Sequence, residues 1–82
     1  MTKSVFTSAY RRFLDLLIQT RKSQCITQVQ MAEALKKPQS YISKYESGER
    51  RLDVIETLEI LKVLKASPAQ FMEELENLSD FQ

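Results

Sequence analysis

The chain contains only one glycine and two prolines among its 82 residues, so few positions are able to break a helix. Apolar residues recur at spacings of three and four from one end to the other, and no segment shows a sustained strand alternation. These patterns predict an all-α fold. With 43% apolar residues, a chain of this length can build one core. We therefore expect residues 1–82 to form a single domain.

Capping signals divide the chain into helices. We expect the first helix from about residue 4 to residue 22, with an inward stripe made of Phe6, Tyr10, Phe13, Leu14, Leu17 and Ile18. The second starts after Thr27, an N-cap residue with Gln30 at the capping-box position. It stops before Pro38, because proline disfavours helical geometry in the residue that precedes it.

The third predicted helix begins at Pro38 or Gln39 and ends at Gly48, which suits the left-handed conformation that terminates helices. Two short helices joined by a turn of about three residues, the second rich in polar side chains, are typical of a helix-turn-helix. The fourth helix starts at Asp53 and is apolar almost all round, so we expect it to be covered on several sides. The fifth opens at Ser67.

The third helix has two distinct faces on a helical wheel. Ile42 and Tyr45 lie together with Glu46, and the opposite face is entirely polar, with Ser40, Ser43, Lys44 and Ser47. Gln39 projects from the helix start. Such side chains suit the major groove of DNA, where donors and acceptors line the base edges. They also suit a face that only contacts water, and the wheel by itself leaves both interpretations open.

The residue types argue against most enzyme and metal sites. The chain has no histidine, and its one cysteine, Cys25, is unable to form an internal disulfide or a four-ligand zinc site. We expect no enzymatic activity, no metal and no cofactor. Neither a membrane-spanning apolar run nor a secretion signal is visible, which predicts a cytoplasmic protein.

Charge is distributed unevenly along the chain. Residues 1–51 carry ten positive charges against four negative, a net of +6, whereas residues 52–82 carry two positive against seven negative, a net of −5. This asymmetry predicts one basic face for a polyanion and an acidic end directed away from it.

Two segments carry a specific resemblance: Ile26-Thr27-Gln28 with Met31-Ala32, and the run from Gln39 to Gly48. Together they resemble the lambda-repressor-like, or XRE-type, helix-turn-helix family, over roughly residues 14–66. The segment from Gly48 to Glu56 looks like that of small stand-alone bacterial regulators in this family. The resemblance implies a compact five-helix DNA-binding domain with the helix-turn-helix at helices 2 and 3.

The same resemblance assigns roles toward double-stranded DNA. It implies that Gln39, Ser40 and Lys44 read base edges, and that Gln28 holds a phosphate and braces Gln39. The predicted contacts to the DNA backbone are Gln28, Tyr41, Ser43, Ser47, Gly48, Arg50 and Arg51. For Tyr41 a phosphate, a thymine methyl group and a half-buried position all stay open.

Glu46 lies on the apolar side of its helix, where an unpaired carboxylate is costly. Arg21 matches a family position that pairs with this glutamate, so we predict a partly buried Arg21–Glu46 ion pair. Three positions depart from the family pattern. Lys36 stands in place of the turn glycine and would have to enter the left-handed region, Pro38 replaces the usual cap, and Cys25 stands where glycine is common.

Members of this family generally bind inverted repeats as twofold dimers, which implies a homodimer. The candidate dimerisation element is the fifth helix and tail, about residues 67–82, with Phe71, Leu75, Leu78 and Phe81 as interface candidates. The alternative is that these residues only cap the core.

The leading functional hypothesis is a sequence-specific DNA-binding regulator that represses transcription from an operator. An antitoxin or a restriction-modification controller would bind DNA in the same way. A helical protein-interaction module with weak DNA binding is the alternative of another class, and the basic first half argues against it. We predict no small-molecule effector.

Overall fold

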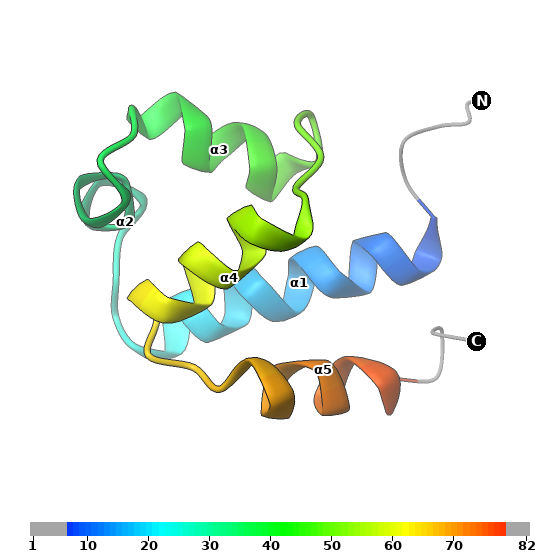
Figure 1. Ribbon diagram of the computed structural model, residues 1–82. Coiled ribbons are helices and arrows are strands. Elements are labelled where there is room, and N and C mark those ends of the chain that lie inside the picture. Colours follow the sequence, from blue (N-terminus) through cyan, green and yellow to red (C-terminus); the bar gives the residue numbers. More distant parts are fainter. Residues whose placement is uncertain (1–6, 79–82) are drawn as a thin grey trace.

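The computed structural model describes residues 7–78, which form five helices around one core (Figure 1). The helices are α1 (Ser8–Ser23), α2 (Gln28–Leu35), α3 (Gln39–Ser47), α4 (Val54–Val63) and α5 (Pro68–Glu76). No strand occurs within residues 7–78, so the predicted all-α fold is confirmed. Within the same range, none of the helices has both the length and the apolar character needed to cross a membrane.

Every helix contributes side chains to the core. The buried cluster consists of Leu17, Met31, Ala32, Ile42, Tyr45, Ile60, Leu61, Leu64 and Phe71. Helices α2 and α3 pack closely on each other, and α3 also contacts α1. Helix α5 lies on the side of the molecule opposite α3, with α1 and α4 between them (Figure 1). The outer face of α3 is therefore far from the acidic last helix.

The predicted helix starts depend on local capping, and three of them are confirmed. Thr27 and Asp53 each accept a hydrogen bond from the backbone N–H three residues on, and Gln30 and Glu56 complete the two capping boxes. Ser67 caps α5, with Pro68 at the first helical position. These bonds satisfy backbone donors that would otherwise lack partners at the helix ends.

The first helix starts later than predicted. Thr7 has extended backbone angles, and its side chain accepts a hydrogen bond from the N–H of Tyr10, so α1 begins at Ser8 rather than near residue 4. A threonine at the N-cap marks the start of a helix, because its side-chain oxygen accepts a hydrogen bond from a backbone N–H that has no partner within the helix. Phe6, which we assigned to the inward stripe, lies outside the described residues.

The prediction that the fourth helix is covered on several sides is wrong. Ile60 and Leu61 are buried, but the exposed fractions of Val54, Ile55 and Leu58 are 69%, 63% and 42%. The amino-terminal half of α4 therefore presents an apolar face to solvent. Apolar side chains exposed in a group often mark an interaction surface.

In the turn between α2 and α3, Lys36 occupies the position where the family pattern has glycine. Lys36 caps the end of α2 with φ 59° and ψ 44°, in the left-handed region. Pro38 precedes α3 and makes no side-chain cap, so α3 begins without one, as we expected. A side chain with a Cβ atom costs roughly 1–2 kcal/mol in the left-handed conformation.

Replacing Lys36 with glycine is expected to raise the free energy of unfolding by roughly 0.5–1 kcal/mol, because glycine removes that strain but makes the unfolded chain more flexible. Chemical denaturation of both proteins measures the difference. Lys36→Ala is the matched control, since alanine removes the charge and keeps the Cβ atom. If the free energy of unfolding rises equally in both variants, removal of the charge rather than relief of backbone strain is the cause.

Candidate nucleic-acid interface

Helix α3 separates its side chains as the wheel predicts. Ile42 and Tyr45 are 0% and 1% exposed and anchor the helix in the core. The opposite side is exposed and polar, with Gln39, Ser40, Ser43, Lys44 and Ser47. The hydroxyl of Ser47 donates to the carbonyl of Lys44 at 3.1 Å and accepts from the N–H of Glu49 at 3.3 Å. The helix thus presents a row of donors and acceptors on a firmly packed support.

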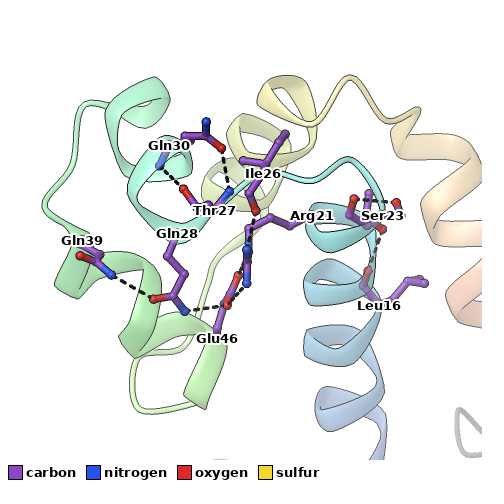
Figure 2. Close-up of polar contacts among 10 residues, drawn as sticks. Leu16, Arg21, Ser23, Ile26, Thr27, Gln28, Gln30, Gln39 and Glu46 are labelled. Atoms are coloured by element: carbon purple, nitrogen blue, oxygen red, sulfur yellow. Dashed lines mark hydrogen bonds and ion pairs between the residues drawn. The ribbon is translucent and has the colours of Figure 1, made fainter.

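Arg21 and Glu46 form an ion pair that joins α1 to α3 (Figure 2). Arg21 Nε donates to Glu46 Oε2 at 2.7 Å, and Arg21 Nη2 donates to Glu46 Oε1 at 3.1 Å. The two side chains are only 9% and 7% exposed. Arg21 Nη1 also donates to the carbonyl of Ile26 at 2.6 Å, so the guanidinium ties the segment before α2 to the same pair. Charge-assisted bidentate bonds of this kind hold both partners in a fixed geometry.

The network continues from Glu46 to the outer face. Gln28 Nε2 donates to Glu46 Oε1 at 3.0 Å, and Gln39 Nε2 donates to Gln28 Oε1 at 3.4 Å (Figure 2). Gln28 is half-buried and Gln39 is exposed. The resemblance implied that Gln28 braces Gln39, but it gave no contact between Gln28 and Glu46, so that link was missed.

Tyr41 lies half-buried at the flank of α3, with cations on its ring. The Lys37 ammonium is 5.2 Å and the Arg50 guanidinium 5.0 Å from the ring centroid. Burial, followed by the nearby Glu56 carboxylate, raises the pKa of Tyr41 above its ordinary value. Lys37 was not among the predicted site residues. Its contact depends on how the turn places it beside the helix, and no motif in the sequence signals that.

Arg50 is partly engaged by the protein itself. Its Nη2 atom donates to Glu56 Oε2 at 2.8 Å, and the hydrogen bond to Glu56 raises the pKa of Arg50. The pKa of Glu56 is lowered, first by the hydrogen bond from the Asp53 backbone and then by Arg50. The Arg50 side chain is 43% exposed, so an anion from solvent can reach its guanidinium.

The loop after α3 is anchored to α1. Gly48 is buried with φ 89°, the left-handed geometry that its position requires. The N–H of Leu52 donates to the hydroxyl of Tyr10 at 3.0 Å, and the Arg51 guanidinium lies 4.2 Å from the centroid of the Tyr10 ring. These contacts place Arg51 beside the first turn of α1.

Of the residues that we predicted to contact DNA, all lie on α2, α3 or the loop that follows α3. The dimer candidates lie elsewhere. Phe71 and Leu75 are 3% and 6% exposed and pack into the core, and Leu78 is half-buried. Phe81 lies outside the described residues.

The chain is similar to known proteins over most of its length. A family model described as helix-turn-helix, HTH_3, matches residues 17–71. Among solved structures, an XRE-family like protein from Pseudomonas syringae pv. tomato str. DC3000 shares 39% sequence identity with a TM-score of 0.83. The alignment covers 88% of each of the two chains. No curated protein matches.

Proposed function

Because the chain belongs to the HTH_3 helix-turn-helix family of XRE-type DNA-binding regulators, we propose that it represses transcription as a homodimer on an inverted-repeat operator. The observation that carries the proposal is the exposed polar face of α3, held by its buried side chains and by the Arg21–Glu46 pair. A single α-helix fits the major groove of DNA, and a rigid one can present its side chains in register with the base edges.

In this proposal the first turns of α3 read bases. Gln39, Ser40 and Lys44 contact base edges, because glutamine suits adenine, lysine suits guanine and serine suits either. The backbone contacts come from Gln28, Tyr41, Ser43, Ser47, the Gly48 amide, Arg50 and Arg51. For Arg50, a phosphate replaces the Glu56 carboxylate, which leaves Glu56 with its capping role. The protein would act on cytoplasmic DNA without a cofactor or a catalytic step.

Selection of bound sequences from a random pool of duplex DNA tests the proposal. We expect an enriched site with twofold symmetry and half-sites about one helical turn apart. Affinity for that site should fall steeply between low and physiological salt, because phosphate contacts release counterions. If no DNA sequence is enriched, or if the affinity does not change with salt concentration, the protein-interaction module is favoured instead. The genes beside this one distinguish a repressor from an antitoxin or a restriction-modification controller.

Replacing Lys44 with alanine is expected to weaken binding to the selected site by about 1–3 kcal/mol and to relax preference at one base pair. Competition binding with duplexes substituted at each position measures both effects. Arg51→Ala is the comparison variant, since a phosphate contact should weaken all sequences about equally. If Lys44→Ala behaves in the same way as Arg51→Ala, Lys44 contacts phosphate rather than a base.

A twofold dimer on DNA needs an interface at the side of the molecule. Copies joined through the face opposite α3 would direct their recognition helices away from each other, and α5 lies on that face (Figure 1). Phe71 and Leu75 also have little exposed surface to offer. The exposed apolar side chains of α4 are the better support for a dimer. Val54 and Leu58, with Met72 of α5, line an apolar groove of about 310 Å³.

A further inference from the structure

A continuous line of polar contacts runs from the buried ion pair to the outer face of α3. It starts at Arg21, passes through Glu46 and Gln28, and ends at Gln39 (Figure 2). Three helices contribute to it, and its last member is a predicted base reader. The order of donors and acceptors along this line determines which amide groups Gln39 can present to DNA.

The orientation of the Gln28 amide is set from the inside. The Arg21 guanidinium has only donors, and both Glu46 oxygens accept from it, at 2.7 and 3.1 Å. A carboxylate in this pair has no hydrogen to give, so Gln28 has to face it with Nε2, as it does at 3.0 Å. Gln28 Oε1 then points outward. A free glutamine amide could take either orientation, because its two ends are nearly equal in size.

The Gln39 amide is oriented in turn by Gln28. Gln28 Oε1 is an acceptor, so Gln39 faces it with Nε2, at 3.4 Å. Gln39 retains Oε1 and one N–H for a ligand. That pair matches adenine, whose N6 donates and whose N7 accepts in the major groove. Guanine offers two acceptors, O6 and N7, and would require Gln39 to turn both N–H groups outward. Its Oε1 would then face Gln28 Oε1, two acceptors without a hydrogen between them.

We propose that Glu46 is a positioning residue for base recognition: through Gln28 it orients the Gln39 amide and so makes Gln39 select adenine over guanine. The inference rests on the proposed function, because it concerns the same recognition helix. The outermost link is long and exposed, so the effect should be a moderate loss of preference rather than loss of binding.

The test uses the purified chain and the DNA site obtained by selection. The base pair read by Gln39 is identified first, as the position whose preference disappears in Gln39→Ala. Affinities for adenine and guanine at that position are then measured by competition for each variant. Glu46→Gln keeps the size of the side chain but offers both a donor and an acceptor, so it no longer imposes one orientation on Gln28. We expect its adenine preference to fall roughly 5- to 10-fold, a part of what a bidentate contact supplies.

Arg21→Lys is the matched control, because it weakens the ion pair and leaves the carboxylate in place. We expect it to lower stability and to keep the adenine preference within roughly twofold of the unmodified chain. If Arg21→Lys and Glu46→Gln lose preference equally, the pair acts only through the fold and the inference is wrong.

Gln28→Ala covers the case in which Glu46→Gln does not fold, since it leaves the Arg21–Glu46 pair intact. It should also lose adenine preference, whereas a purely phosphate-contacting Gln28 would weaken all sequences equally. An unchanged preference in either folded variant overturns the role of Glu46 without touching the proposed function. Failure of the unmodified chain to select any site would instead overturn the proposed function.

Discussion

Replacing Glu46 with alanine is expected to lower the free energy of unfolding by about 3–5 kcal/mol, because it leaves the Arg21 guanidinium buried without its anion. The pair is nearly inaccessible to water, so solvent screening offers little compensation. Gln28 loses its acceptor in the same substitution. For a domain of this size the melting temperature should fall by more than roughly 10 °C. Thermal and urea denaturation followed by circular dichroism measure the change.

The ion pair of Arg11 with Asp15 on α1 is the matched control. It has a similar length of 3.0 Å, but its side chains are 43% and 48% exposed. Asp15→Ala should therefore cost only roughly 0.3–0.5 kcal/mol. Equal losses in the two variants would mean that burial of the Arg21–Glu46 pair adds nothing, and the interpretation of Glu46 as a structural link between α1 and α3 would fail.

Introducing a charge at Ile55 is expected to separate the proposed dimer. Ile55→Glu places a carboxylate in an apolar surface that a partner would bury, and its 63% exposure means that the monomer itself should be unaffected. Affinity for the full inverted repeat should fall by roughly 10²- to 10⁴-fold, because two linked half-sites no longer reinforce each other. Binding to a single half-site should stay unchanged. Light scattering gives the oligomeric state, and gel shifts give both affinities.

Two comparison variants locate the interface. Ala69→Glu adds one carboxylate at an exposed position of α5 and should leave the dimer intact. Leu78→Glu changes the tail that we first predicted as the dimerisation element. A dimer that survives Ile55→Glu but dissociates with Leu78→Glu would place the interface at residues 67–82. A chain that is monomeric at high concentration without any substitution would contradict the dimer itself.

The helices and their ends were predictable because the forces that set them act over a few residues. Thr27 with Gln30 and Asp53 with Glu56 are capping boxes within one helical turn, and Gly48 ends α3 through its own backbone freedom. The two faces of α3 follow from the helical period. The late start of α1 was missed, although Thr7 is a good N-cap, because no acidic or amide residue three positions on completes the motif.

The candidate site was predictable only in part. Its outward residues followed from the wheel, and the pairing of Arg21 with Glu46 came from the family resemblance. No pattern within the chain joined Arg50 to Glu56 or brought Lys37 over Tyr41. In each contact one residue lies in a turn or loop, so the distance depends on the path of that segment beside the neighbouring helix.

Residue types and their spacing were sufficient for an all-α chain with a helix-turn-helix whose second helix has one apolar and one polar face. Hydrogen bonds over three or four residues and the 3.6-residue period act within single helices, so those features could be predicted without knowledge of the packing. Packing decided the rest. It left Val54, Ile55 and Leu58 of an apolar helix in solvent, and it placed Gln28 between Glu46 and Gln39. The exposure of the α4 side chains and the order of hydrogen-bond donors from Glu46 to Gln39 both depend on which helices are neighbours, and only the packed core determines that.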